Sequence, residues 1–347
     1  MKLGLSALGF GPTIQIDLER IRRAESLGFD SAWTAEAYGN DAVTTATWVL
    51  ANTSRIKVGT AIMQMPARTP AMTAMTAMSL DQLSGGRFLL GLGASGPQVV
   101  EGWHGVPYGN AMTRTREYIA IVRQILAREK PLEFHGEIYD VPTTAPGATG
   151  LGKPLKSILH GSSSIPIYVA SISPGGLRCA AEFADGVFPM MMDPEKFDRS
   201  YLPYLQQGFA KAGGGKNLAS FAVVASASVI VSDDVEKARN ALKPGMALYI
   251  GGMGARDKNF YNDLAKRLGY EEAAKRIQDL YLDGKKAEAT AAVPDSLVDA
   301  VHLVGPRARV KERLQAWKEA GRKGWVHTLN VGSPQPAALE LLAEELL

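Results

Sequence analysis

Short apolar runs alternate with amphipathic stretches along almost the whole chain. The apolar runs predict strands at residues 3–8, 31–35, 56–62, 88–92, 165–170, 186–190, 221–231 and 325–331. The amphipathic stretches predict helices at 16–27, 44–51, from 70 onward, 113–128, 174–183, 197–212, 307–320 and 336–347. This alternation is typical of parallel strands that are joined by helical crossovers.

The alternation gives eight strands, most of them followed by a helix, in 347 residues. Barrels of the (β/α)8 type reach this length as one domain, so the pattern favours a closed TIM barrel over a doubly wound sheet. We therefore predict an α/β fold in which residues 1–347 form a single barrel domain. Segments 97–112, 133–164 and 254–292 exceed a minimal barrel and are expected to be insertions that form lids or partner surfaces.

Composition and charge argue against two kinds of partner, nucleic acids and membranes. The net charge is only +3 and the charged residues are interspersed, which argues against nucleic acid as the main partner. No apolar run approaches the ~18 residues of a membrane span, and the N-terminus opens on a strand-like run without a leader. The single cysteine, Cys179, excludes an internal disulfide and fits a reducing compartment. We expect a cytoplasmic protein without a membrane partner.

Several catalytic chemistries have no support in the sequence. The five histidines are scattered, and neither an HExxH motif nor a cysteine pair is present, so we expect no metal site. Cys179 falls in a helical stretch and is interpreted as a small buried residue rather than a nucleophile. No GxSxG motif occurs, and GLGASG at 91–96 lacks the glycine spacing of a dinucleotide-binding fingerprint.

Two neighbouring strands end in small residues. Residues 59–61 read Gly-Thr-Ala, and residues 93–96 read Gly-Ala-Ser-Gly. Ligands of parallel α/β folds bind at the carboxyl ends of the strands, so backbone without bulky side chains there would accept a broad, flat ligand. We predict a planar cofactor that lies against these two strand ends, the second of which includes Ala94 and Ser95.

A phosphate site is predicted in SISPGG, residues 171–176. Proline at the first helical turn, Ser173 as a cap and the amides of Gly175 and Gly176 form a helix start that suits an anion, and Ser171 adds a hydroxyl. The alternative is simply a well-capped helix.

Polar candidates lie at the same strand ends. Glu36 ends the strand SAWTAE and is placed for contact with a ligand, or else it is a solvated loop acid. Trp103, His104 and Tyr108 in GWHGVPY follow the small-residue strand end, where they either cover a flat ring and donate a proton or pack against one another.

Six segments in order resemble the bacterial luciferase-like superfamily, specifically its deazaflavin-dependent oxidoreductases. They are LGFDSAWTAE (27–36), SRIKVGTAI (54–62), LSGGRFLLGLGASG (83–96), TREYIAIVRQIL (115–126), IPIYVAS (165–171) and AEFADGVFP (181–189). The segments 101–108 and 249–270 are most similar to members of the methylenetetrahydromethanopterin-reductase-like subgroup.

The resemblance implies a (β/α)8 barrel with insertions, usually a homodimer. It implies a non-proline cis peptide at Ala61–Ile62, with Ile62 behind the ring of the cofactor, and a phosphate loop at SISPGG. It also implies an acidic or polar residue near the ring at Glu36. The sequence departs from the sugar-phosphate dehydrogenases of this group, because Ala37 replaces a histidine and residues 95–97 lack an acid. Relatives that use FMN often hold its phosphate with an arginine near 91–96, and none is present, which favours coenzyme F420.

The leading hypothesis is an oxidoreductase that transfers a hydride between F420 and a small organic substrate. His104, Tyr108 and Glu36 are the candidate proton donors. Two alternatives remain: an FMN-dependent two-component monooxygenase on the same fold, and a non-catalytic flavin-binding protein.

Overall fold

Eight parallel strands close into a barrel in the computed structural model, which describes residues 1–8, 11–332 and 335–347. Pairing runs β12–β1–β2–β3–β5–β8–β9–β10, and β10 pairs again with β12. In chain order the strands are β1 (Lys2–Ser6), β2 (Ser31–Thr34), β3 (Lys57–Thr60), β5 (Phe88–Gly93), β8 (Ile167–Ala170), β9 (Gly186–Phe188), β10 (Ala222–Val231) and β12 (Thr328–Gly332). The predicted TIM barrel is confirmed.

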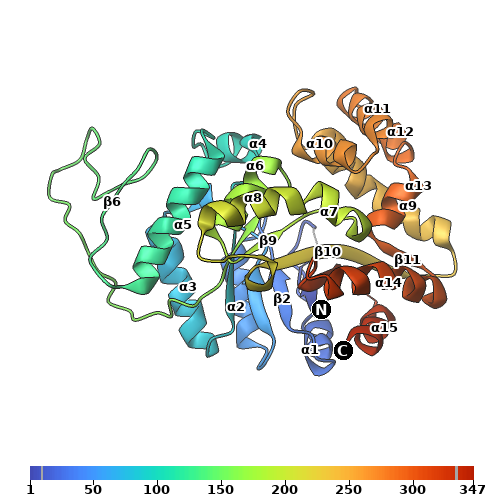
Figure 1. Ribbon diagram of the computed structural model, residues 1–347, viewed down its shortest axis with the longest axis horizontal. Helices are drawn as coiled ribbons and strands as arrows, with labels where there is room; N and C mark the ends of the chain where they lie inside the picture. Colours follow the sequence, from blue (N-terminus) through green and yellow to red (C-terminus); the bar gives the residue numbers. More distant parts are fainter. Residues whose placement is uncertain (9–10, 333–334) are drawn as a thin grey trace.

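Helices surround the barrel (Figure 1). The outer layer consists of α1 (Leu18–Ser26), α2 (Ala42–Ala51), α3 (Pro70–Ser84), α5 (Ala111–Ala127), α6 (Pro174–Phe183), α7 (Phe197–Ser200), α8 (Leu202–Ala212), α14 (Arg307–Arg322) and α15 (Pro336–Leu346). Side-chain caps fix several starts: Asp41 accepts from the Thr44 amide, and Thr69 from the Met72 amide. Gly85 ends α3 with φ 69°, a left-handed conformation that favours glycine.

The stretch 197–212 was predicted as one helix and forms two. The backbone leaves helical geometry at Tyr201, with φ −132°, and α8 begins at the next residue with Pro203 in its first turn. Proline cannot donate to the preceding turn, so the helix restarts there. Residues 9–10 and 333–334 lie outside the described ranges.

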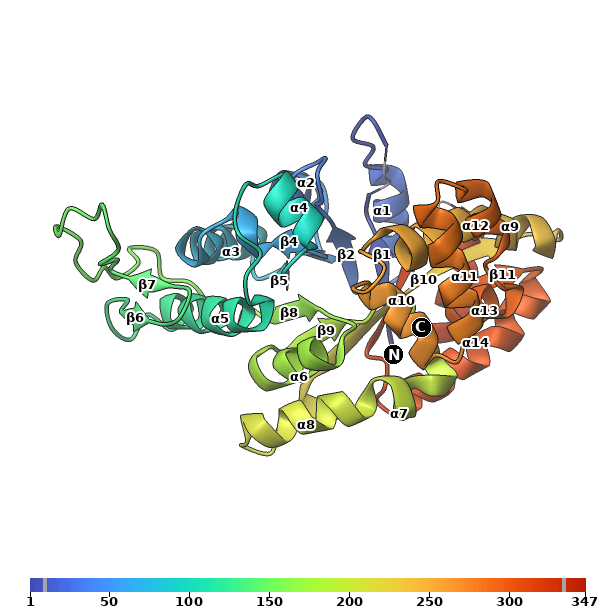
Figure 2. The ribbon, with the colours of Figure 1, turned by 90° about the horizontal axis from the view of Figure 1, so that it is seen from above.

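Three parts of the chain lie outside the repeating units. Helix α4 (Pro97–Gly102) follows β5, and an arm between α5 and β8 carries the hairpin of β6 (Phe134–His135) and β7 (Asp140–Val141). After β10 come α9 (Val235–Ala247), the π-helix η4 (Leu248–Gly252), α10 (Phe260–Arg267), α11 (Glu271–Leu282), α12 (Lys286–Ala291), α13 (Asp295–Val301) and β11 (Leu303–Gly305). Figure 2 shows the arm projecting from one side and this helical segment on the opposite side.

Short elements complete the chain. Strand β4 (Met63–Gln64) continues the line of β3 and pairs with the end of β5, so Gln64 lies opposite Gly93. Single 3-10 turns are η1 (Met65–Ala67), η2 (Pro194–Lys196) and η3 (Leu218–Ser220). Within the described ranges, none of the helices combines the length and apolar character needed to cross a bilayer.

The barrel interior is packed with aromatic side chains. Trp33, Phe188 and Tyr168 meet edge-on or tilted, with ring centroids 5.0 to 5.6 Å apart. Ile62 packs against this cluster from the end of β3. The interior is therefore filled, and ligand chemistry belongs to the loops at the carboxyl ends of the strands.

Candidate functional site

The small residues at the ends of β3 and β5 accommodate side chains of the protein itself. An ideal Cβ on Gly59 would lie 2.3 Å from the ring of Trp33, and one on Gly93 would lie 2.6 Å from Cδ1 of Ile62. The expectation that these glycines leave bare backbone for a flat ligand is wrong, because Trp33 and Ile62 occupy that space. Ile62 itself is half-buried and leaves part of its surface at the mouth of the barrel.

The peptide bond between Ala61 and Ile62 is cis. It joins β3 to β4 and places Ala61 and Ile62 beside the aromatic cluster of the interior. Both residues are only partly buried. They form a short apolar surface at the carboxyl end of the barrel.

Three predicted cofactor-binding residues share one small pocket. Ala94, Ser171 and Gly176 line it together with Val169 and Cys179. The next residue after Ala94, Ser95, adopts φ 60°, a left-handed conformation that is uncommon outside glycine. The structure thus brings the end of β5 against the start of α6.

The start of α6 has donors free for an anion. The Ser173 hydroxyl oxygen accepts from the Gly176 amide at 3.2 Å. In the described part of the chain, the Gly175 amide and the Ser171 hydroxyl take no hydrogen-bond partner. A Cβ on Gly175 would find only Arg178 Nη2, at 4.0 Å, so the position is open. Two free donors at the positive end of a ten-residue helix fit a phosphate group.

Arg267 reaches this loop from α10. It is a site residue that the sequence did not indicate. Its Nη2 donates to the Ile172 carbonyl at 2.5 Å, across 95 residues of sequence. A guanidinium beside the proposed phosphate loop adds positive charge to it. No local motif marks Arg267, because the contact depends on how the segment after β10 folds back.

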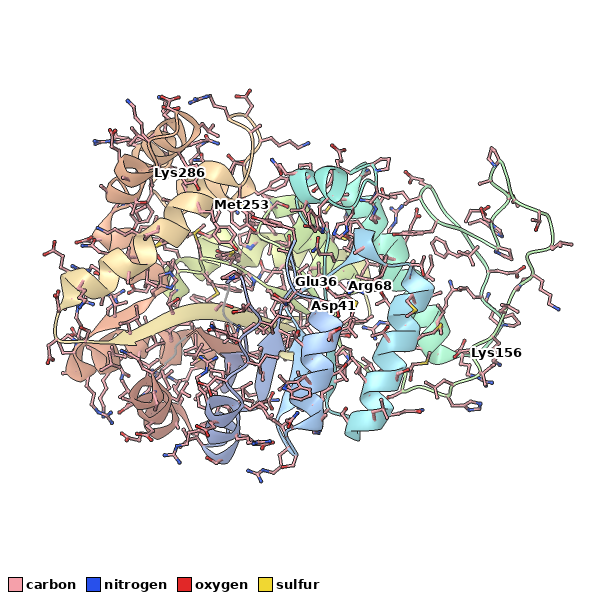
Figure 3. The ribbon with its side chains drawn as sticks, turned by 180° about the vertical axis from the view of Figure 1, so that it is seen from behind. Glu36, Asp41, Arg68, Lys156, Met253 and Lys286 are labelled. Carbon is pink, nitrogen blue, oxygen red and sulfur yellow. The ribbon has the colours of Figure 1, made fainter. Side chains whose placement is uncertain are left out.

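Glu36 lies in an ion cluster (Figure 3). One carboxylate oxygen accepts from Arg68 Nη1 at 2.5 Å and from the Gln64 amide at 2.6 Å. The other accepts from Arg68 Nη2 and from the Ala42 amide, both at 3.0 Å. The Glu36 side chain is only 6% exposed. Both oxygens have internal partners, so Glu36 is neither a solvated loop acid nor placed to transfer a proton directly.

Arg68 also pairs with Asp41, the cap of α2. Burial acts to lower the pKa of Arg68, but Glu36 and Asp41 hold it above its ordinary value. Burial acts to raise the pKa of Asp41, while the Thr44 amide and Arg68 hold it below its ordinary value. Arg68 lies in a loop without a recognisable motif, so the sequence alone does not single it out.

His104 is joined to this cluster through Gln64. Its Nε2 lies 3.2 Å from Gln64 Oε1, and Gln64 Nε2 donates to the Ala37 carbonyl at 2.5 Å. The structure thereby connects two predicted site residues, Glu36 and His104, by way of a glutamine that sequence reasoning did not single out.

Tyr108 lies in the same loop but is not part of that chain of hydrogen bonds. Its amide donates to Glu101 at 3.1 Å, and its carbonyl accepts from Arg114 at 2.6 Å. Burial raises the pKa of the Tyr108 phenol, and the positive charge of Arg114 acts in the opposite direction. Trp103 is exposed, so the loop is not closed by mutual packing of its aromatic side chains.

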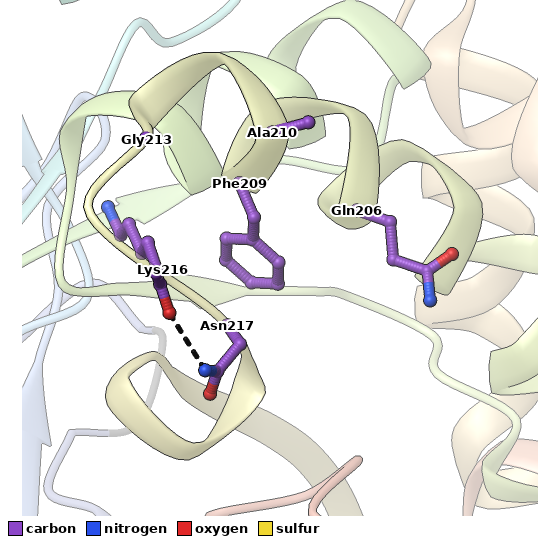
Figure 4. A pocket seen from close by; sticks show the side chains of 7 residues that line it. Gln206, Phe209, Ala210, Gly213, Lys216 and Asn217 are labelled. Atoms are coloured by element: carbon purple, nitrogen blue, oxygen red, sulfur yellow. Dashed lines mark hydrogen bonds between the residues drawn. The ribbon is translucent and has the colours of Figure 1, made fainter.

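A wider pocket lies at the opposite end of the barrel, between the end of α8 and η3 (Figure 4). It has a volume of about 370 Å³ and includes Phe209, Lys216 and Asn217 in its lining. Lys216 Nζ donates to the carbonyl of Ala184 at 2.6 Å and so caps the carboxyl end of α6. The pocket lies just before β10 begins, away from the carboxyl ends, and contains none of the predicted site residues.

The sequence predicts neither a metal site nor a nucleophilic cysteine. Among the described residues, no three His, Cys, Asp or Glu side chains gather closely enough to hold a metal ion. Cys179 is buried, and burial raises the pKa of its thiol to about 11, so the unreactive thiol form dominates at neutral pH.

Comparison with known proteins identifies similar proteins that cover nearly the whole chain. A Mycobacterium tuberculosis protein named "Putative coenzyme F420-dependent oxidoreductase" is 43% identical over 92% of this chain and 93% of its own length. The 5,10-methylenetetrahydromethanopterin reductase of Archaeoglobus fulgidus is 29% identical over 94% and 93%. The solved structure of the coenzyme F420 dependent tetrahydromethanopterin reductase from Methanopyrus kandleri has a TM-score of 0.78 and 25% identity, covering 99% of this chain and 97% of that one.

Residues 2–324 match the family described as luciferase-like monooxygenase. This match spans nearly the whole barrel, including residues 171–176 and the loop that carries His104. The chain therefore belongs to the luciferase-like monooxygenase family.

Proposed function

We propose that this protein is an oxidoreductase that binds coenzyme F420 and uses it to reduce or oxidise a small organic molecule. The observation that carries the proposal is the pair of free donors, the Gly175 amide and the Ser171 hydroxyl, at the edge of the pocket that reaches Ala94. The names of the relatives support F420 as the cofactor. Bound F420 supplies the hydride carrier, and the protein supplies orientation and electrostatics.

The residues divide into three roles under this proposal. Ser171, Ser173, Gly175 and Gly176 bind the phosphate of the cofactor, and the Arg267 guanidinium adds positive charge nearby. Ala61 and Ile62 support the ring, with Ala94 and Ser95 as the neighbouring wall.

His104 and Tyr108 are the candidates that exchange a proton with the substrate. Glu36 takes a different role from the predicted one. Its oxygens are committed to Arg68 and to two backbone amides, so it positions the loops after β2 and β4.

Parallel titrations with F420 and FMN test the cofactor. The change in absorbance on binding gives the affinity for each cofactor. We expect F420 to bind purified protein with at least tenfold higher affinity than FMN. Tight binding of FMN together with oxygen-dependent turnover would instead identify an FMN-dependent monooxygenase. Cofactor binding without turnover across a broad substrate panel would favour a flavin-binding protein.

The phosphate loop is tested by Gly175→Asp. The site is open, so the variant folds, and its carboxylate repels an anion at the helix start. We expect F420 affinity to fall at least tenfold. Gly245→Asp, on the exposed face of α9 with open space around it, is the matched control and leaves affinity unchanged. Equal affinities in the two variants would exclude the phosphate from this loop.

A further inference from the structure

Gln64 bridges the buried ion cluster and the loop that carries His104. The residue is 1% exposed and lies in β4, opposite Gly93. Its backbone amide donates to Glu36 at 2.6 Å, and its side chain reaches Ala37 on one side and His104 on the other. Every polar group of the side chain therefore has a partner.

The chemistry of the partners fixes the direction of each hydrogen bond. The Ala37 carbonyl only accepts, so the amide nitrogen of Gln64 faces it at 2.5 Å. The amide oxygen then faces His104, and an amide oxygen also only accepts. The hydrogen in the 3.2 Å contact must therefore belong to Nε2 of His104.

This assignment determines the tautomer of the imidazole. A neutral ring with a hydrogen on Nε2 carries its lone pair on Nδ1, and a charged ring carries hydrogens on both nitrogens. The contact with Gln64 persists in both states. Only Nδ1 changes between them.

We propose that Gln64 is a positioning residue that holds His104 in the Nε2–H tautomer, so that Nδ1 is the atom that accepts and releases the proton at the mouth of the barrel. The delivery of that proton to a substrate rests on the proposed oxidoreductase function; the tautomer does not. Gln64 is itself held in place because Arg68 and the Ala42 amide fix Glu36, and Glu36 accepts from the Gln64 amide.

The test is a long-range proton–nitrogen NMR spectrum of the full chain labelled with ¹⁵N-histidine. Spectra are recorded near pH 8, where an ordinary imidazole, with a pKa of about 6.5, is neutral. His104→Asn identifies the His104 signals among the five histidines. We expect a protonated Nε2 and an unprotonated Nδ1 in the wild type. A protonated Nδ1, or the averaged signals of an unrestrained ring, would overturn the proposal.

Two variants isolate the acceptor on Gln64. Gln64→Met and Gln64→Glu both remove the donor to Ala37, but only Met also removes the acceptor for His104. We expect the separated signals to move toward an average in Gln64→Met, and Nε2 to stay protonated in Gln64→Glu, whose carboxylate still accepts from it. Retention in a folded Gln64→Met, checked by circular dichroism, would overturn the proposal. If Gln64→Met does not fold, the tautomer of His104 in the wild type tests the proposal by itself.

The control is Gln82→Met. Gln82 donates to the backbone carbonyl of His160 at 2.6 Å and is exposed on α3, so its loss leaves the His104 ring untouched. F420 titration is independent of these spectra. A fixed tautomer in a protein that does not bind F420 would refute the proposed function and retain the role of Gln64.

Discussion

At the scale of single residues, the ion cluster at the barrel mouth depends on Arg68. Removal of Arg68 leaves Glu36 buried with only two backbone donors. Loss of one partner of a buried ion pair is strongly destabilising because the remaining charge is uncompensated. We expect Arg68→Met to lower the free energy of unfolding by about 2–4 kcal/mol, measured by urea denaturation.

The matched control for Arg68→Met is Arg322→Met. Arg322 pairs with Glu319 at 3.1 Å on the exposed side of α14. Exposed pairs contribute about 0–1 kcal/mol, so this variant should differ little from the wild type. Similar losses in both variants would show that the cluster is not energetically distinct from a surface pair.

His302 gives the stability a pH dependence. The Ser228 amide donates to its Nδ1 at 3.1 Å, so the neutral ring is the form that fits, and burial lowers the pKa of His302 to about 4. The ordinary pKa is about 6.5, so this stabilisation is complete above pH 6.5 and is lost as the pH falls toward 4. The difference between a pKa of about 4 in the folded protein and about 6.5 in the unfolded chain corresponds to roughly 3 kcal/mol.

His302→Gln keeps a hydrogen-bond acceptor but does not titrate. We therefore expect the wild type to lose roughly 3 kcal/mol more than this variant between about pH 7 and pH 4, from urea unfolding at each pH. Parallel stability curves would show that His302 is not held neutral in the folded protein.

The parts of the site formed by consecutive residues could be predicted from the sequence, whereas the parts formed by distant residues could not. The start of α6 was recognisable because its cap, proline and glycines are consecutive. Arg68 lies 32 residues from Glu36, and Arg267 lies 95 residues from Ile172. Such contacts form only when the barrel closes. The close contact between Ile62 and Gly93 could not be predicted for the same reason.

At the scale of elements, the strands of the barrel were all predictable, and segment 133–164 was predicted as an insertion, but the β6–β7 hairpin within it was not. Most residues of the barrel strands are buried, so each strand stands out in the sequence as a short, largely apolar run. The arm lacks such a pattern, and buried Glu117 on α5 holds the turn between β6 and β7. The carboxylate of Glu117 accepts from the amides of Glu137, Ile138 and Tyr139 at 2.8 to 3.1 Å.

Glu117→Gln tests this anchor. Burial acts to raise the pKa of Glu117, but the three amides hold it below its ordinary value, so the carboxylate form is required. A carboxamide offers one acceptor oxygen instead of two. We expect faster hydrogen exchange at 137–139, earlier proteolysis within the arm, and a loss of roughly 1–2 kcal/mol in the free energy of unfolding.

The neighbouring Glu137→Gln is the control. Glu137 is exposed, and its carboxylate pairs with Arg116 at 3.3 Å. Its replacement should leave exchange at 137–139 within error of the wild type. Equal effects of the two substitutions would mean that the Glu117 carboxylate does not hold the arm.

At the scale of the whole molecule, two outer helices differ from the rest. The sequence of α14 is rich in Lys, Arg and Glu, whereas α2 contains no charged residue and α3 contains only Asp81. Trp48 is 56% exposed, Met75 is 54% exposed and Leu83 is 83% exposed on these two helices. An apolar face without charge is self-complementary, because two copies meet there without like-charge repulsion.

We therefore expect the protein to be a homodimer that buries the outer faces of α2 and α3. In a twofold dimer each substitution occurs twice, so Met75→Glu places two carboxylates in one apolar interface. Light scattering after gel filtration at micromolar concentration should give the mass of a dimer for the wild type and of a monomer for Met75→Glu. Leu282→Glu, at the exposed end of α11, should remain dimeric. A monomeric wild type, or a dimeric Met75→Glu, would show that this face is not the interface, and the exposed Leu151, Leu155 and Ile158 of the arm would then be the next surface to substitute.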